Sequence, residues 1–505
     1  MPVARTYSRA QIGIQAPAVT VEAFPTSGLA HIVIVGMAET AVKESKDRVR
    51  AAIGNSGYRV PGRKITVNLA PADLSKQGGR YDLAIALAIL EATGQISSGC
   101  LENFEFMGEL ALDGSLRPVH GVLPAAIACK QTPHTLIVPR ANGTEAALAG
   151  DVRIRVADSL LDVIAFLGSG TALDRPRPVA CRSVGSALRL SDIRGQTLAK
   201  HALVIAAAGA HNLLFIGPPG TGKTMLASRL PSLLPELRLE ESLEVASIQS
   251  VSKYGFDSDV WGIRPFRSPH HTASGVALVG GGSPPRPGEI SLAHQGVLFL
   301  DELPEYPRHV LEVLREPLES GQIIISRAHH QVRFPSRFQL VAAMNPCPCG
   351  YLGDALGRCN CGIVDVERYR GRISGPLLDR IDLHVDVPPL PRGALSDPDF
   401  QASAAEHDEA VARVARCQEI MWRRSGKLNA HLSSREVEQT CKLSASDQKL
   451  LDEAMHKLGL SARGYYKVLK VSRTIADLSG TKGIETPHLK QAMSFRRLDR
   501  HIEDV

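Results

Sequence analysis

The chain has 505 residues, of which 44% are hydrophobic, so it is too long for one ordinary core and apolar enough to build two or three. Its formal net charge of +6 comes from 58 basic and 52 acidic residues spread along the whole length, so charge alone does not indicate a nucleic-acid partner. No stretch approaches the roughly 20 apolar residues of a membrane span, and the first ten residues lack the apolar core of a secretory signal. We therefore expect a multidomain cytoplasmic protein without a membrane partner.

The first third of the chain has the pattern of a small mixed α/β domain. Across residues 1–170, short apolar runs such as HIVIVG at 31–36 and TLIVP at 135–139 alternate with stretches of helical periodicity. Residues 171–190 contain prolines and arginines without a clear period, which indicates an interdomain linker. We therefore expect a domain boundary near residue 190.

A strand, a glycine-rich loop and a helix follow the linker in that order. NLLFIG at 212–217 is typical of a buried strand, and the loop GPPGTGKT leads into the helical pattern KTMLASRL. Further apolar strands at 297–300 and 340–343 alternate with helices, which predicts a parallel sheet with helices on both faces across residues 191–392. Residues 393–505 are helical in pattern and predict a separate helical lid.

The glycine-rich loop has the composition of a phosphate-binding loop. Its glycines let backbone N–H groups approach phosphate oxygens, Lys223 is placed to neutralise the β and γ phosphates of ATP, and Thr224 is placed to hold Mg²⁺. Gln196, like His211 and Asn212, precedes the loop and is a candidate for the base pocket, with packing or capping as the alternative. The predicted nucleotide contacts are Gly217, Pro218, Pro219, Gly220, Thr221, Gly222, Lys223, Thr224 and Gln196.

An acidic pair and an asparagine end two further core strands. Asp301 in VLFLDE is expected to bind Mg²⁺, and Glu302 is expected to polarise the attacking water. Asn345 in LVAAMNP is expected to orient that water and sense the γ phosphate, although an asparagine before Pro346 also initiates turns. Together with Lys223, these residues predict an ATPase whose cofactors are ATP and Mg²⁺.

Phosphoryl transfer also calls for arginines that stabilise the transition state from outside the pocket. Arg380 in RISGPLLDRIDLHVDVP leads into a strand, a suitable position for reaching the nucleotide of a neighbouring subunit. Arg463 lies at the start of a lid helix, where it is placed to contact phosphate, and Arg473 in the same helix is its rival. Each of these arginines, taken alone, is more often part of a surface ion pair.

Four of the nine cysteines lie within fifteen residues. CPCGYLGDALGRCNC at 347–361 places Cys347, Cys349, Cys359 and Cys361 in two C-x-C pairs. Four thiolates at close quarters suit tetrahedral Zn²⁺, although the commoner gap within each pair is two residues. We expect a structural zinc that braces the loop after the third core strand, with reduced thiols or a redox pair as the alternatives.

Several motifs taken together resemble one family. DIRGQ at 192–196, RPFRSPHHTASGVALVGGGSPPRPGEISLAHQGVLFLDELPE at 264–305, NPCPCGY and RISGPLLDRIDLHV are similar to the magnesium-chelatase-like AAA+ family called YifB or ComM, over nearly the whole chain. The resemblance implies a homo-oligomeric ring, expected to be a hexamer, that acts in natural transformation as an ATP-driven DNA branch-migration helicase. It also implies that Arg380 is a finger acting in trans and that Arg463 is the lid sensor.

The same resemblance implies two insertions that point into the central channel of the ring. Residues 275–289 are expected to form an irregular loop. ESGQIIISRAHHQVRFP at 319–335 predicts a β-hairpin before the third core strand, with Arg327, His329 and His330 at or near its tip. These three residues are candidate contacts with single-stranded or branched DNA, with an incidental turn or a pH-dependent contact as the alternatives.

The N-terminal region looks like the Lon protease domain, a fold of the ribosomal-protein S5 type, and GELALDGSLRPVHGVLPAAIACK at 108–130 is the clearest match. A Lon-type protease needs a serine nucleophile and a lysine base. KQGGRYDLAIALAIL at 76–90 contains no serine, and the helical pattern GVLPAAIA contains no lysine. We therefore expect a domain for assembly or substrate binding, without the protease dyad.

Two other functions share this ATPase core. A magnesium-chelatase-type motor subunit would act on a tetrapyrrole with partner subunits, but the Lon-like region and the cysteine cluster favour the DNA motor. An AAA+ protein remodeller would need an aromatic-hydrophobic pore loop, and the sequence offers no convincing one. The expected architecture is an α/β AAA+ core with a helical lid, preceded by a Lon-like α/β domain.

Overall fold

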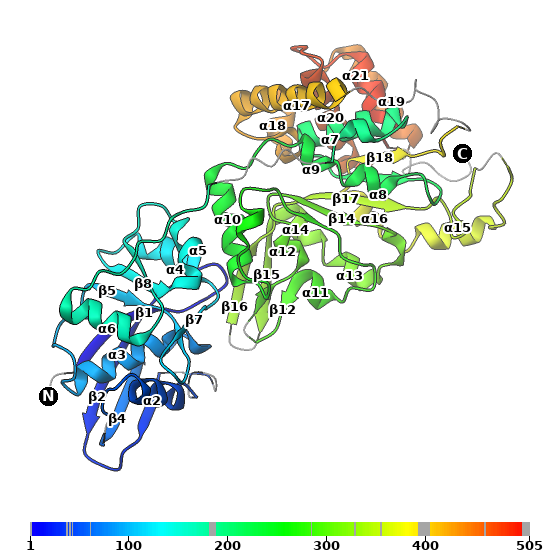
Figure 1. The fold of residues 1–505 in the computed structure, drawn as a ribbon. Coiled ribbons are helices and arrows are strands. Elements are labelled where there is room, and N and C mark those ends of the chain that lie inside the picture. The colour runs from blue at the N-terminus through cyan, green and yellow to red at the C-terminus, as the bar shows by residue number, and fades with distance from the viewer. Residues whose placement is uncertain are drawn as a thin grey trace.

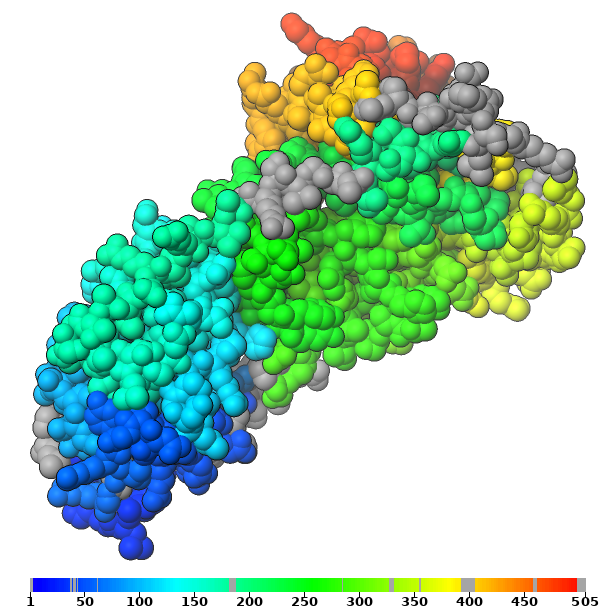
Figure 2. Space-filling view, viewed as in Figure 1, coloured from blue at the N-terminus to red at the C-terminus, as the bar shows by residue number. Residues whose placement is uncertain are grey.

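A computed structural model shows three parts along the molecule (Figure 1). The N-terminal part surrounds one sheet, the central part surrounds a second sheet, and the C-terminal part consists of helices that pack on the central part. The N-terminal part extends from one side of the central part, so the molecule is elongated (Figure 2). The residues that the structure describes are 3–36, 39, 42, 44–60, 62–180, 188–283, 285–327, 330–353, 356–391, 404–458 and 461–496.

The N-terminal sheet mixes antiparallel and parallel strands, in the order β3-β4-β2-β1-β5-β8-β9. Strand β2 is antiparallel to its neighbours β1 and β4, and the remaining neighbours are parallel. Helix α3 packs against β1 and β2 and is buried almost all round, which explains why DLAIALAILEA has no polar face. The strands are β1 (Ala4–Arg9), β2 (Ala18–Thr26), β3 (Ile32–Val35), β4 (Lys64–Ala70), β5 (Phe104–Phe106), β6 (Glu109–Leu110), β7 (Leu116–Arg117), β8 (Thr135–Pro139) and β9 (Ile154–Ala157). The helices are α2 (Ser45–Asn55), α3 (Asp82–Ala92), α4 (Val122–Cys129), α5 (Gly143–Ala147) and α6 (Leu160–Ser169).

A second apolar core of the N-terminal part is shared with the central part. Side chains of α4, α5, β8 and β9 pack with Trp261, which is only 4% exposed, and with Ala246 of α10 (Leu239–Val251). Polar contacts cross the same junction. The Gly121 N–H donates to the Ser250 carbonyl at 3.0 Å, and the Ser250 hydroxyl donates to the buried Glu145 carboxylate. The N-terminal part is therefore packed against the central part and is not held by the linker alone.

The central sheet is parallel throughout, as predicted, with the strand order β11-β14-β17-β10-β18. Strands β10, β14 and β17 are buried at every position, which explains why their sequences are continuous apolar runs without alternation. The strands are β10 (Leu213–Ile216), β11 (Phe266–Arg267), β14 (Val297–Leu300), β17 (Gln339–Met344) and β18 (Leu383–Asp386). The helices, besides α10, are α7 (Thr197–Gly209), α8 (Lys223–Ala227), α9 (Leu230–Leu233), α11 (Gly275–Val279), α12 (Glu289–Leu292), α13 (Arg308–Glu312), α14 (Arg315–Ser320), α15 (Ile363–Arg370) and α16 (Gly375–Leu378).

Two hairpins project from the central part side by side (Figure 1). The hairpin predicted before the third core strand is confirmed, since β15 (Gln322–Arg327) pairs with β16 (His330–Pro335). The prediction of an irregular loop at 275–289 is wrong in part. The Ser274 hydroxyl caps the short helix α11, and β12 (Gly280–Gly281) then pairs with β13 (Arg286–Pro287). The two hairpins touch, because a Cβ at Gly280 would lie 3.0 Å from the Ile325 side chain.

The C-terminal helices cover the face of the central sheet that carries α7. Helices α17 and α20 pack on α7, and their apolar side chains join those of β10 and β18 in one core. The helices are α17 (Ala404–Ser425), α18 (Ser434–Thr440), α19 (Ala445–Leu458), α20 (Ala462–Leu478) and α21 (Thr486–Ser494). Among the described residues, no helix has both the length and the apolar character that crossing a membrane requires.

The shared core around Trp261 gives a test of how the N-terminal part is held. Replacing a buried tryptophan by alanine costs about 3–5 kcal/mol, because packing is lost and a cavity remains. The other tryptophan, Trp422, is 44% exposed and is a matched control. We expect Trp261→Ala to lower the thermal unfolding midpoint of the full chain by several degrees more than Trp422→Ala does, measured by calorimetry. Equal shifts would contradict the shared core.

Candidate active site

The phosphate loop joins β10 to α8, and its glycines are required by its geometry. Gly220 and Gly222 have φ of +78° and +87°, a region in which other residues are strained. Gly217 leaves no room for a side chain, since a Cβ there would lie 2.2 Å from the Val387 carbonyl oxygen. The loop therefore has the tight turn and exposed backbone that a phosphate cradle needs.

Lys223, the first residue of α8, and Asn345, directly after β17, meet at this loop. The Lys223 ammonium donates to the Gly217 carbonyl at 2.7 Å, to the Pro218 carbonyl at 2.9 Å and to Asn345 Oδ1 at 3.1 Å. Burial lowers the pKa of Lys223, while the charges of Asp301 and Glu302 act in the opposite direction. Lys223 is therefore a partly desolvated cation. A bound phosphate would replace these carbonyl and amide oxygens as its hydrogen-bond partner.

The acidic pair lies next to the same loop. Thr224 Oγ1 donates to Asp301 Oδ2 at 2.7 Å, so the two predicted Mg²⁺ ligands are in direct contact. Glu302 has a left-handed backbone, with φ of +51°, and its half-exposed carboxylate lies 3.1 Å from His271 Nδ1. The sequence reasoning missed His271. The available signal was the polar turn SPHHT, which directly follows β11, the strand beside the one that carries the acidic pair.

Gln196 borders the loop, whereas the two residues before β10 are structural. Gln196 Nε2 donates to the Pro388 carbonyl at 2.7 Å and lies 3.5 Å from the Thr221 carbonyl. His211 is fully buried and pairs with the Thr474 hydroxyl at 2.7 Å, and Asn212 joins β17 to the segment before β18. For His211 and Asn212, packing is therefore the correct alternative.

Arg380 lies at the other end of the sheet from the phosphate loop. Its backbone carbonyl accepts a hydrogen bond from Asn212, just before β10, whereas the phosphate loop follows β10. The five residue-to-residue steps from Asn212 to Gly217 span about 16 Å of extended chain, which is longer than an arginine side chain. Its guanidinium is nearly buried, donates to the Pro376 carbonyl at 2.6 Å and pairs with Glu319. Arg380 therefore cannot reach the phosphate loop of its own chain.

Arg463 lies on the same side as Arg380 and not at its own phosphate loop. Its guanidinium is 3.6 Å from Glu319, the carboxylate that also binds Arg380. Lys467 fixes this position because it is one turn further along α20 and pairs with Asp382 at 2.5 Å, two residues after Arg380. The rival Arg473 is 2% exposed and is engaged by Asp477 and two backbone carbonyls, so it is a structural residue.

Arg380 borders an open hollow of about 450 Å³. Glu319 and Arg315 of α14 line it, together with Arg380. Burial lowers the pKa of Arg380, and the neighbouring charges of Arg463 and Arg315 act in the same direction while Glu319 opposes them. The lining also contains the carboxylates of Glu312 and Glu316, so guanidinium and carboxylate groups lie together in this hollow.

The candidate DNA contacts are located at the end of the β15–β16 hairpin. Arg327 is the last residue of β15, and it is paired in the ladder with His330, the first residue of β16. His329 lies outside the described residues. The hairpin also packs on the N-terminal part, because a Cβ at Gly13 would lie 2.7 Å from the Val332 side chain.

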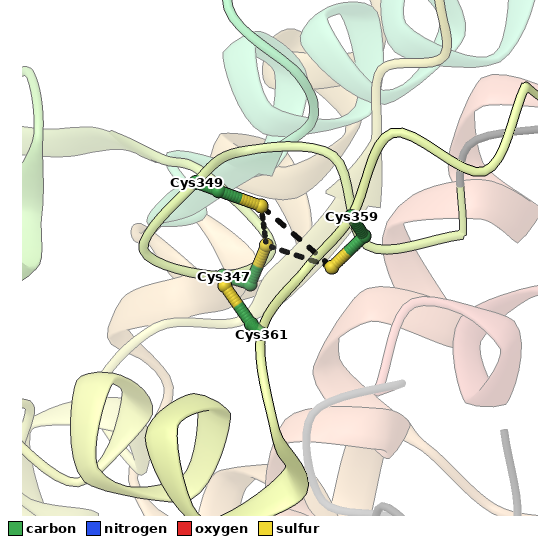
Figure 3. A group of neighbouring side chains, drawn as sticks. All are labelled: Cys347, Cys349, Cys359 and Cys361. Atoms are coloured by element: carbon green, nitrogen blue, oxygen red, sulfur yellow. Dashed lines mark hydrogen bonds between the residues drawn. The ribbon is translucent and has the colours of Figure 1, made fainter.

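The four cysteines converge at the base of one loop (Figure 3). The Cys347 and Cys349 sulfurs are 3.3 Å apart, the Cys359 sulfur is 3.8 and 3.6 Å from them, and all four lie within 4.8 Å of one another. Tetrahedral Zn²⁺ with Zn–S bonds of about 2.3 Å holds its sulfurs about 3.8 Å apart. A hydrogen bond from the Tyr351 backbone lowers the pKa of the Cys349 thiol to about 6, whereas hydrogen bonds to Cys349 and Cys347 raise the pKa of the Cys359 and Cys361 thiols. The donor set fits a closed zinc site.

Comparison with known proteins agrees with this geometry. Three family models match: magnesium chelatase, subunit ChlI, over residues 189–395; subunit ChlI of Mg-chelatase over 21–142; and the C-terminal region of that subunit over 405–496. The competence protein ComM of Haemophilus influenzae is 50% identical over 511 aligned residues, which cover all of this chain and 99% of the relative. The chain belongs to the YifB/ComM family of magnesium-chelatase-like AAA+ proteins.

Other relatives show how far the similarity reaches. The uncharacterized protein YifB of Escherichia coli is 48% identical over 99% of this chain and 98% of its own length. The magnesium-chelatase 38 kDa subunit of Rhodobacter capsulatus is 26% identical over only 60% of this chain and 85% of its own length. Membership of the AAA+ class implies an ATPase that uses a nucleotide and Mg²⁺.

The sulfur cluster predicts a bound metal. We expect the purified full chain to hold about one equivalent of zinc per chain, measured by inductively coupled plasma mass spectrometry. Replacing Cys347 and Cys349 together by serine should abolish that zinc, because two thiolates cannot complete the coordination. Cys100→Ser, outside the cluster, is the control and should leave the zinc content unchanged. A native preparation without metal contradicts the assignment.

Proposed function

We propose that this protein is an ATP-driven DNA motor. It assembles as a homo-oligomeric ring, expected to be a hexamer, and promotes branch migration of single-stranded or branched DNA intermediates in the cytoplasm during natural transformation. The observation that carries the proposal is the meeting of Lys223, Thr224, Asp301 and Asn345 at one end of the sheet, with two arginines out of reach at the other. Full-length similarity to a competence protein supports the DNA cargo.

The pocket residues have distinct roles in hydrolysis. Backbone N–H groups of residues 217–224 and the Lys223 ammonium would bind the phosphates of ATP, and Thr224 with Asp301 would hold Mg²⁺, which neutralises charge on those phosphates. Glu302 would polarise the attacking water, and Asn345 would orient it beside Lys223. Gln196 would border the nucleotide from the side of Pro388.

Completion of this pocket requires a second subunit. Arg380 and Arg463 share Glu319 as a partner, so they would act together on the nucleotide of the neighbouring subunit. The sequence predicts that Arg463 contacts phosphate as a lid sensor, but it does not indicate in which subunit that phosphate lies. The position of Arg463 beside Arg380 supports the nucleotide of the neighbouring subunit. An arginine supplied in this way stabilises the charge that spreads over the transferred phosphoryl group.

The hairpins are the proposed DNA contacts. The β15–β16 hairpin, with Arg327 and His330 at its end, would approach the phosphate backbone inside the ring channel, and the β12–β13 hairpin would lie beside it. Their mutual contact and the contact of Gly13 with Val332 make both hairpins rigid extensions of the core. A rigid contact can transmit movement of the subunits to DNA.

The outer parts of the chain are assigned supporting roles. We propose a division into a Lon-like domain (1–170), a linker (171–190), the AAA+ core (191–392) and a helical lid (393–505). In the first of these, Ser75 donates to Glu39, and the Lys76 ammonium donates to the Pro71 carbonyl. The proposed role of this domain is assembly or substrate binding. The zinc at the four cysteines would be structural.

Two alternatives share the pocket and differ in cargo. A magnesium-chelatase-type subunit is favoured by the names of the matching family models, but the relative of that name aligns with only 60% of this chain. A protein remodeller would thread polypeptide through the same ring. Stimulation by DNA, by porphyrin with partner subunits, or by unfolded protein separates the three.

DNA stimulation of the ATPase tests the proposal. We expect forked and four-way DNA to raise the ATPase rate of the full chain several-fold over the rate with blunt duplex. This stimulation should fall as salt rises from about 50 to about 200 mM, because phosphate contacts release counterions. As a control, Glu302→Gln should bind ATP and DNA but hydrolyse ATP at least about 100-fold more slowly. If none of these DNAs binds or stimulates, the DNA motor is the wrong function.

A further inference from the structure

The cysteine loop and the start of α15 expose apolar side chains. Leu356 is 69% exposed, Ile363 66% and Val364 65%, whereas Val366 and Tyr369 of the same helix are buried against the core. Large apolar side chains scattered singly on a surface need no explanation, but these three fall within nine residues that run from the cysteine loop into the first turn of α15. Figure 1 shows α15 and its preceding loop at the edge of the core that faces away from the N-terminal part.

This loop rests directly on the phosphate loop. Gly350 has φ of +85°, and a Cβ at that position would lie 2.8 Å from the Pro219 side chain and 3.7 Å from that of Asn345. The two loops are therefore in contact through a position at which only glycine fits. A displacement of the cysteine loop would reach Pro219 and Asn345 without an intermediate element.

The sulfur cluster determines the shape of this segment. It joins the start of the loop, at Cys347 and Cys349, to its end, at Cys359 and Cys361, immediately before α15 (Figure 3). Tyr351 and Arg358 stack across the loop, with the guanidinium carbon 4.3 Å from the ring centre. A four-thiolate metal site would thus hold the exposed apolar residues in one fixed arrangement.

The proposed function requires a second copy of the chain at this edge. Arg380 is separated from its own phosphate loop by the length of β10, about 16 Å. An arginine that reaches the nucleotide would therefore come from a neighbour that lies at the carboxyl ends of β10 and β17. The cysteine loop follows β17 at that same edge, next to Pro219. Apolar residues there would be covered by the neighbour that brings the arginines.

We propose that the metal-braced cysteine loop, with Leu356, Ile363 and Val364, is a contact surface for the neighbouring copy of this chain, beside the shared nucleotide pocket. The inference rests on the proposed ring function and adds the surface by which subunits meet. Burial of the three side chains contributes to assembly, and the metal keeps them in position. Metal content and ring assembly are therefore linked through a site that does not contact the nucleotide itself.

The test uses the full chain carrying Leu356→Glu together with Val364→Glu. We expect this variant to bind a fluorescent ATP analogue within about twofold of the wild-type affinity, since it leaves the phosphate loop intact. In mass photometry with a nonhydrolysable ATP analogue it should remain monomeric at concentrations where the wild type assembles. Its ATPase rate should fall at least about tenfold, because Arg380 and Arg463 of a neighbouring copy no longer reach the nucleotide pocket.

The chain offers a matched control and a second variant. Leu112→Glu with Leu161→Glu changes two leucines of the N-terminal part that are 59% and 48% exposed, and should assemble as the wild type does. Cys347→Ser with Cys349→Ser should lose assembly in parallel with its metal. Normal assembly of the Leu356→Glu, Val364→Glu variant, or of the metal-free cysteine variant, would overturn the inference.

Failure of the inference and failure of the proposed function give different results. Arg380→Ala should assemble normally but hydrolyse ATP slowly. Full ATP turnover by Arg380→Ala would show that Arg380 does not complete the nucleotide pocket of a neighbouring subunit. That result does not depend on how the Leu356→Glu, Val364→Glu variant behaves. If the Leu356→Glu, Val364→Glu variant assembles normally and Arg380→Ala turns over slowly, only the proposed contact surface is contradicted, and the proposed function stands. A wild-type chain that stays monomeric with the ATP analogue would contradict both.

Discussion

The direction of two neighbouring strands decides how this enzyme is built. Because β10 and β18 are adjacent and parallel, the phosphate loop after β10 and Arg380 before β18 lie at opposite ends of one sheet. One chain therefore holds a phosphate cradle at one edge and a pair of guanidinium groups at the other. The separation follows from the sheet itself, and no side-chain rearrangement within a single chain removes it.

Packing between the sheet and the C-terminal helices maintains this arrangement. Asp382, just before β18, accepts hydrogen bonds from the Asn212 N–H at 2.8 Å and from Lys467 at 2.5 Å. Burial alone would raise the pKa of Asp382, but Lys467 and His211 hold it well below its usual range. An anion so stabilised ties α20 to the strand ends. Arg463, one turn before Lys467, is thereby held beside Arg380, and its position is a consequence of the fold.

Some of the site was predictable from sequence because its residues are adjacent to strong local signals. Lys223, Asp301 and Asn345 each follow an apolar run, and the carboxyl ends of parallel strands meet at one edge, so their convergence could be anticipated. The cysteine cluster was evident from spacing. In both cases the sequence neighbours of each residue carry the information.

Contacts between distant segments were not predictable in the same way. The pairing of His271 with Glu302, the sharing of Glu319 by Arg380 and Arg463, and the contact of Gly350 with Pro219 depend on tertiary packing. The prediction of an irregular loop at 275–289 was wrong in part because glycine and proline dominate that segment. Ser274 nevertheless caps a short helix at its start. The shared core around Trp261 was not predicted, because the sequence around a tryptophan does not indicate which domain packs on it.

We propose that each pocket is completed by a neighbouring subunit, and mixing chains that carry different substitutions tests this proposal. Glu302→Gln chains keep Arg380 but lack the water-polarising carboxylate, whereas Arg380→Ala chains keep the pocket but lack the guanidinium. Each variant alone should be nearly inactive, and an equal mixture should regain a substantial part of the wild-type ATPase rate, because some interfaces then combine an intact pocket with an intact arginine. If mixed rings form, as shown by capture through a tag on one variant, and the mixture stays inactive, a neighbouring subunit does not complete the pocket.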